Sequence, residues 1–190
     1  MPLIKNGRVV ADRYVHVLDD APPPDGIPVI IPAARFLADA AEILHHDASV
    51  GVAWPNDRRV AELAPYLDRL ALVALVFPTF KDGRAYSQAR LLRERYGFRG
   101  ELRATGQILR DQFMFLVRAG FDVLDVAKPG DVDAFPSALK RYTVFYQAAG
   151  EGRTSAARLR LARSSVPITR GPEFATSSEL GASLAGRVSR

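Results

Sequence analysis

From Val29 onward, short apolar runs alternate with amphipathic stretches about three turns long, and this alternation constrains the fold more than any other feature. We predict strands at residues 29–31, 50–54, 71–77, 101–105, 121–126 and 143–147. We predict helices at residues 33–46, 57–70, 85–96, 107–119 and 131–141. Several strand runs are apolar on both sides, which is typical of a parallel sheet covered by helices.

This order predicts an α/β fold with a mostly parallel sheet of about five or six strands. Right-handed crossovers leave two arrangements of such a sheet. We favour a three-layer open sheet with helices on both faces, because six units are too few for a closed eight-stranded barrel. The alternative is a partial barrel-like (β/α) arrangement. Alternating apolar residues over 8–18 predict an N-terminal edge strand or hairpin in addition.

The positive charge of the chain is concentrated at its end. Residues 1–152 hold 19 Lys and Arg against 19 Asp and Glu, whereas residues 153–190 hold seven Arg against two Glu. We therefore expect a single α/β domain over residues 1–150 and a basic, mostly disordered tail over 151–190. Within this tail, residues 153–163 could form a helix. Arginines without interleaved aromatic residues argue against nucleic-acid binding.

Several classes of protein are excluded by what the sequence lacks. Without cysteine, the chain holds no disulfide, no thiolate metal site and no self-ligated iron–sulfur cluster. It has no apolar run long enough for a membrane helix and no long apolar leader, so we expect a soluble, cytoplasmic protein. No H-E-x-x-H, Gly-rich nucleotide motif or G-x-S-x-G is present, so we assign no metal site and no catalytic residue.

Polar side chains gather after the predicted strands at residues 71–77 and 101–105, and ligands of parallel sheets bind at such carboxyl ends. Residues 81–118 carry nine Lys and Arg against four Asp and Glu, a local charge of +5. Arginine suits an oxyanion such as sulfite, phosphate or a carboxylate. The candidates for an anion or cofactor site are Thr79, Lys81, Asp82, Arg84, Ser87, Arg103, Thr105, Gln107, Arg110 and Asp111.

The aromatic candidates at this edge are Trp54 and Tyr86. Trp54 could stack on a flat ligand, although packing is the commoner role of tryptophan. The charged residues also have a structural interpretation, in which Asp82 belongs to a turn and Asp111 only neutralises an arginine. Residues 90–95 would then be a solvated helix face with weak ion pairs. The sequence does not identify a cofactor, and a flavin or a nicotinamide nucleotide is possible.

Residues 77–93, FPTFKDGRAYSQARLLR, resemble the signature of an uncharacterised bacterial domain-of-unknown-function family, family 934. The resemblance continues at residues 95–97, 100–104, 110–112, 118–122 and 146–147. It covers most of residues 1–150 and is densest over 77–122. Some relatives place a cysteine where this chain has Ala119, so the resemblance implies no thiol-based mechanism here.

The resemblance implies a biological setting but supplies no catalytic residues. Genes of the family often lie beside the gene for the assimilatory sulfite or nitrite reductase hemoprotein, and one member is labelled a probable oxidoreductase. This implies a role in sulfite reduction and cysteine biosynthesis, with the hemoprotein as the suspected partner.

Two functions follow as hypotheses. The first is an accessory protein or oxidoreductase of sulfite reduction in sulfate assimilation, acting with the hemoprotein. The alternative is a small-molecule enzyme with an anion, flavin or nucleotide site at the strand carboxyl ends. Whether the chain is an enzyme stays open. Residues 107–119 are very apolar and predict a buried helix. So much apolar surface could also form an interface, so a homo-oligomer is a further possibility.

Overall fold

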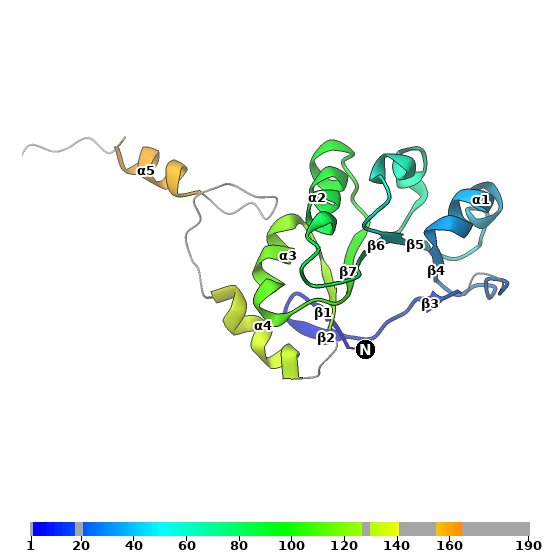
Figure 1. Ribbon diagram of the computed structural model, residues 1–190, viewed down its shortest axis with the longest axis horizontal. Helices are drawn as coiled ribbons and strands as arrows, with labels where there is room; N and C mark the ends of the chain where they lie inside the picture. The colour runs from blue at the N-terminus through cyan, green and yellow to red at the C-terminus, as the bar shows by residue number, and fades with distance from the viewer. Residues whose placement is uncertain (1, 18–20, 127–129, 141–154, 165–190) are drawn as a thin grey trace, which may run out of the picture.

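The computed structural model describes residues 2–17, 21–126, 130–140 and 155–164, in which helices pack along one face of a curled sheet (Figure 1). The strands are β1 (Leu3–Lys5), β2 (Arg8–Val10), β3 (Val15–His16), β4 (Val29–Pro32), β5 (Val50–Pro55), β6 (Leu72–Phe77), β7 (Glu101–Gly106) and β8 (Val123–Asp125). The predicted strand at 143–147 and most of the predicted tail lie outside the described residues.

The helices follow the predicted positions, with changes of helix type. They are α1 (Ala33–Ile43), the 3₁₀ helix η1 (Val60–Arg69), α2 (Arg84–Arg90), the π-helix η2 (Leu91–Arg95), the 3₁₀ helix η3 (Arg110–Gln112), α3 (Phe113–Ala119), α4 (Gly130–Lys140) and α5 (Ala156–Ser164). Pro65 lies inside η1, where it removes a backbone donor that a longer α-helix would need. No helix in the described ranges is long and apolar enough to cross a membrane.

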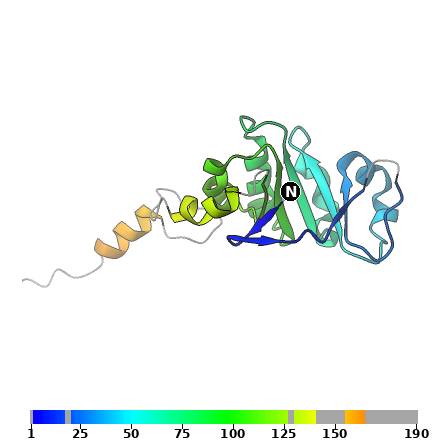
Figure 2. The ribbon, with the colours of Figure 1, turned by 90° about the horizontal axis from the view of Figure 1, so that it is seen from below.

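The sheet runs in the order β2-β1-β8-β7-β6-β5-β4-β3. Strands β3 to β8 are parallel to one another, while β1 is antiparallel to β8 and β2 is antiparallel to β1. From β4 to β8 each crossover advances in the same direction. Right-handed crossovers therefore place the helices α1, η1, α2 and α3 on one face, and the sheet curls into a half barrel (Figure 2).

The α/β class and the mostly parallel sheet are confirmed, and the partial barrel-like arrangement is the one that fits. The helices do not divide between both faces, because a doubly wound sheet requires the strand order to reverse and β4 to β8 follow in sequence. We call the helix-covered face the outer face and the opposite one the inner face.

The outer face carries the main core. Trp54, Leu75 and Phe77 project from β5 and β6 against helix residues such as Phe36 of α1 and Phe113 of α3, and all five are fully buried. A smaller cluster on the inner face contains Ile30, Leu72 and Ala74. Apolar side chains on both sides of β6 explain why its sequence is continuously apolar.

The N-terminal segment contributes to both edges of the sheet. Asn6 and Gly7, with φ angles of +52° and +77°, form the tight turn of the β1–β2 hairpin, since such turns require positive φ. Residues 11–14, which we call the strap, then lead to β3, which pairs with β4 at the opposite edge. Tyr14 of the strap packs on the inner-face cluster. The predicted strand or hairpin over 8–18 is thus divided between the two edges.

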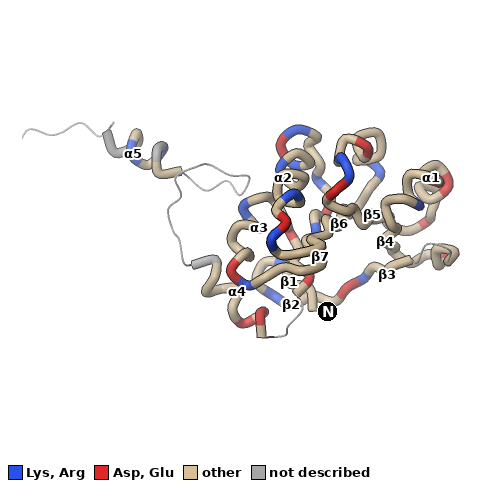
Figure 3. The backbone as a smooth tube through the Cα atoms, in the orientation of Figure 1, with Lys and Arg blue, Asp and Glu red and all other residues tan. Residues whose placement is uncertain are grey.

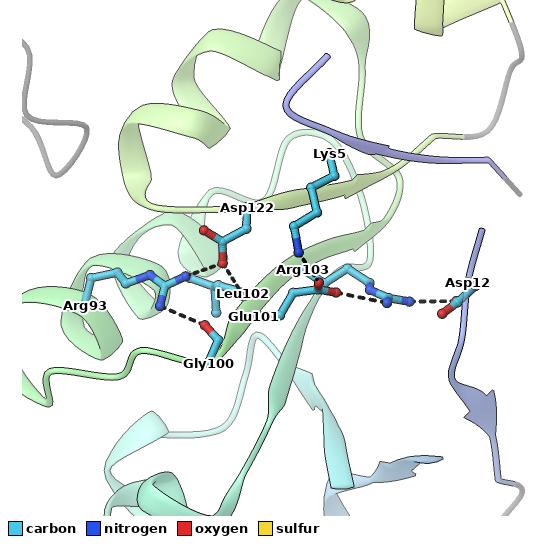
Figure 4. Close-up of polar contacts among 8 residues, drawn as sticks. All are labelled: Lys5, Asp12, Arg93, Gly100, Glu101, Leu102, Arg103 and Asp122. Carbon is cyan, nitrogen blue, oxygen red and sulfur yellow. Dashed lines mark hydrogen bonds and ion pairs between the residues drawn. The ribbon is translucent and has the colours of Figure 1, made fainter. Parts of the chain in front are cut away.

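At the amino ends of β7 and β8, Arg93 joins three parts of the chain (Figure 4). Its guanidinium donates to the backbone carbonyls of Phe98, Gly100 and Gly120 and to the carboxylate of Asp122. The same carboxylate accepts the backbone N–H of Leu102 at 2.8 Å. With a side chain only 19% exposed, Arg93 does not belong to a solvated helix face.

We predict that Arg93→Ala lowers the free energy of unfolding by about 2–4 kcal/mol, because it leaves carbonyl groups and a carboxylate without their charged donor. Arg90→Ala is the matched control on the same helical stretch, since within the described ranges Arg90 forms an exposed pair with Glu94. That control should cost at most about 0.5 kcal/mol. Urea unfolding of both variants measures the difference, and equal losses would contradict this role of Arg93.

Candidate functional site

The loops after β5, β6 and β7 meet at the carboxyl edge of the sheet, where two glutamines connect them. Gln88 of α2 is buried, and its Nε2 donates to the carbonyl oxygens of Pro55 at 3.2 Å and Arg58 at 2.8 Å. Gln112 donates to the carbonyl of Phe80 at 2.9 Å, and its Oε1 accepts the backbone N–H of Leu109 at 2.9 Å. The three loops are therefore held by side-chain amides.

Gly106 lets the ends of β6 and β7 approach closely. Its φ is +91°, and a Cβ at this position would lie within 2.4 Å of the Phe77 carbonyl oxygen. The same oxygen accepts the backbone N–H of Gln107 at 2.8 Å. Only glycine fits here, because any other side chain would push the two loops apart.

Asp82 and Arg84 satisfy each other at the start of α2. The Asp82 carboxylate accepts the Arg84 guanidinium at 2.6 Å and the Arg84 backbone N–H at 3.2 Å. These bonds with Arg84, together with the nearby Asn56 amide, hold the pKa of Asp82 far below its ordinary value. Asp82 and Arg84 are therefore paired with each other within the loop.

The loop after β6 and the loop after β7 present apolar side chains to solvent. Phe80 is 41% exposed and Leu109 is 42% exposed, and both belong to the backbone segments that Gln112 joins. The ammonium of Lys81 lies 5.7 Å from the centre of the Phe80 ring, in a cation–π arrangement. We call Phe80, Lys81 and Leu109 the loop surface.

The other candidates at this edge differ in accessibility. Thr79, Ser87 and Gln107 are exposed. Arg110 and Asp111 line a groove of about 580 Å³ that also contains Met114 of α3 and Asp133 of α4.

The two aromatic candidates have different surroundings. Tyr86 is half-buried with its ring edge-on to Phe77 at 5.3 Å, and burial, followed by the charge of Asp111, raises the pKa of Tyr86 to about 12. Trp54 is fully buried in the outer-face core, so it packs against protein and cannot stack on a ligand.

Arg103 lies apart from these loops, on the inner face (Figure 4). Its Nη1 donates to Asp12 of the strap at 2.7 Å and its Nη2 donates to Glu101 at 3.0 Å, while its guanidinium lies over the Tyr14 ring. Lys5 of β1 completes the network through Glu101 at 2.9 Å.

The local charge of +5 does not converge on one site. Figure 3 shows basic positions distributed over α2, α3 and the sheet, with acidic positions between them. Thr105 lies two residues after Arg103 on β7, on the same inner face, and is half-buried. The structure therefore brings Asp82 and Arg84 together at the edge and leaves Arg103 and Thr105 outside that group.

Two carboxyl groups near Arg103 have pKa values shifted in opposite directions. Burial alone would raise the pKa of Asp12, but the bonds from Arg103 and the Tyr14 backbone N–H outweigh it and lower the value. Burial raises the pKa of Asp125 on β8, and its Oδ1 has no hydrogen-bond partner among the described residues.

Among the described residues no three His, Asp or Glu side chains gather in a group that could hold a metal ion. Phe80, Gln88, Leu109 and Gln112 were not among the predicted site residues. The signal that could have found the two glutamines is the family resemblance, since both amides lie within the matching runs. What this edge offers chemically is an ordered surface with apolar and basic side chains, suited to binding.

We predict that Asp12→Asn and Asp125→Asn change stability with opposite signs at pH 7. The lowered pKa of Asp12 stabilises the fold above its ordinary value of 3.8, and this contribution is lost as the pH falls through the lowered pKa. Asp12→Asn should therefore destabilise by about 1–2 kcal/mol at pH 7 and much less at pH 3.

The raised pKa of Asp125 means that ionisation of this carboxyl group is less favourable in the folded protein than in the unfolded chain. The ionised carboxylate therefore destabilises the fold at pH values above that pKa, and this destabilisation is absent below 3.8. Asp125→Asn should accordingly stabilise at pH 7 and not at pH 3. Urea unfolding at the two pH values tests both variants, with Asp25→Asn in an exposed loop as control. Shifts of the same sign for Asp12 and Asp125 would refute the opposed titrations.

A family model described as "Bacterial protein of unknown function (DUF934)" matches residues 51–157, which are 107 of the 190 residues. The match begins in β5 and includes the loop surface, Arg93 and Arg103, whereas the hairpin and the strap precede it. No curated protein matches the chain. The family resemblance seen in the sequence is thus confirmed, and the chain belongs to the DUF934 family of bacterial proteins.

Proposed function

We propose that this protein is a non-catalytic accessory protein that binds the hemoprotein of assimilatory sulfite reductase through its loop surface. The observation that carries the proposal is the exposure of Phe80 and Leu109 on two loops that Gln112 holds together. Exposed apolar side chains on ordered loops are favourable for protein binding, because little conformational entropy is lost there when a partner docks. The choice of partner rests on the resemblance in sequence.

A binding role is consistent with the finding that several charged candidate residues form ion pairs within the chain. Asp82 pairs with Arg84, and Arg103 pairs with Asp12 and Glu101, so these groups are engaged within the chain. Lys81 has no carboxylate partner among the described residues and lies beside Phe80. Its charge would favour an acidic patch on the hemoprotein and increase the association rate at low salt. The two proteins would meet in the cytoplasm.

We predict that the Phe80→Ser, Leu109→Ser double variant binds the purified hemoprotein at least tenfold more weakly than the unmodified chain. Removing two neighbouring apolar contacts from the centre of an interface has effects of this size. Leu91→Ser is the matched control, because Leu91 is 41% exposed but belongs to η2. Surface plasmon resonance against the hemoprotein of the same organism measures the affinities.

Three results would count against the accessory role. The first is the absence of measurable binding between the purified proteins at micromolar concentration. The second is an equal loss of affinity in the Leu91→Ser control, which would mean that the loop surface is not the contact. Unchanged sulfite reduction in a strain lacking this gene would also count against the proposal.

A visible absorption spectrum of the purified protein separates this role from the oxidoreductase alternative. An accessory protein that acts only by docking should purify colourless. A stoichiometric flavin band would instead show a redox cofactor, and the proposal of a non-catalytic role would then be wrong.

A further inference from the structure

A groove of about 580 Å³ lies between α4 on one side and η3 and α3 on the other. Phe115 of α3 lines it with a side chain that is 56% exposed, and Met114 lies beside it. The α4 side presents small side chains at helical spacing, namely Ala134, Ser137 and Ala138. Such a row lets another helix approach closely, and the exposed apolar ring gives that helix a surface to pack on. The groove therefore has the form of a helix-binding site.

Carboxylates lie on both sides of this groove. Asp111 of η3 lies on one side and Asp133 of α4 on the other, and we call them the rim carboxylates. Among the described residues neither of them belongs to an ion pair. Arg110 is the one cation among the described lining residues, which leaves the lining with one negative charge in excess. The other cations of α3 and α4, Arg118 and Lys140, belong to the last turns of these helices.

Helix α5 has nine residues, and none of its described residues belongs to a core cluster. In both views of the ribbon it lies beyond α4 and apart from the sheet (Figure 1, Figure 2). Helices shorter than about 12–15 residues are only marginally stable in water, because most helical stability in proteins comes from packing. Leu159 of α5 is 40% exposed. A surface that covers this leucine would therefore stabilise the helix.

The side chains of α5 match the groove in both charge and apolar character. Successive helical residues are about 100° apart, so Arg158 and Arg160 flank Leu159 on opposite sides. Both arginines are exposed, and the helix contains no acidic residue. With Leu159 against Phe115, α5 presents one arginine to each rim carboxylate. This arrangement pairs the two basic side chains with the two acidic ones across the contact.

We propose that this protein forms a symmetric dimer in which α5 of each copy packs in the groove of the other copy. The second copy is the occupant because α5 projects away from the body of its own chain (Figure 1). A two-fold exchange makes the same contact twice, which doubles the buried surface. The contact shares no residue with the loop surface, so the dimer is independent of docking to the hemoprotein.

Sedimentation velocity of the full chain at low salt tests the dimer. The mass should rise with protein concentration from 20.8 kDa to twice that value. Raising the salt to about 0.5 M should weaken the dimer several-fold, because it screens the attraction between the arginines and the rim carboxylates. A chain that stays monomeric up to about 100 µM would overturn the proposal, and this includes a helix α5 that packs in its own groove.

Two single variants locate the contact. Phe115→Ser alters the groove and Leu159→Ser alters the helix, and each should weaken dimerisation at least tenfold because each change occurs twice in the dimer. Neither residue belongs to a core cluster, so the melting temperature should be retained. Phe80→Ser is the matched control, since Phe80 is 41% exposed on the loop surface. It should leave the dimer intact.

Mixing the two variants distinguishes helix exchange from other ways of associating. Each variant alone forms dimers with two impaired contacts. In the mixture the intact α5 of Phe115→Ser meets the intact groove of Leu159→Ser, so the mixture should contain more dimer than either variant alone. The proposal is overturned if mixing restores nothing, if neither variant weakens the dimer, or if Phe80→Ser weakens it equally.

Discussion

A buried guanidinium on the inner face of the half barrel is the constraint on which the arrangement of the N-terminal segment depends. Arg103 projects from the middle of the sheet to the face that no described helix covers, and a charge in that position is costly unless it is paired. Glu101 supplies one carboxylate from the same strand, and Asp12 supplies the second from the strap. The strap is therefore fixed to β7, and the hairpin and β3 are positioned at either side of it.

Much of the sheet could be predicted from local patterns. The apolar runs of β5 and β6 identify buried parallel strands, because side chains on both of their faces are covered. The order of the strands could not be derived in the same way, since no single run encodes whether the sequence of crossovers reverses. The hairpin had a local signal in Asn6-Gly7, but its pairing with β8 is a contact between distant segments.

The candidate site was predictable to the extent that its residues follow a strand directly. Asp82 and Arg84 lie after β6 and are found there. Arg103 was grouped with them because a charge count along the sequence ignores that alternate strand residues point to opposite faces. The same alternation applies to Trp54. It lies near the end of a strand, but its side chain points to the outer face and is buried in the core there.

The pairing of β1 with β8 has a consequence for how the chain assembles during synthesis. Leu3 pairs with Asp125, so β1 must wait during synthesis for a partner that is made about 120 residues later. Strands β4 to β7 can associate in the order in which they emerge, with each new strand extending the preceding edge. The hairpin and the strap then join last, although they were made first, and this long-range closure is expected to be the slow step of folding.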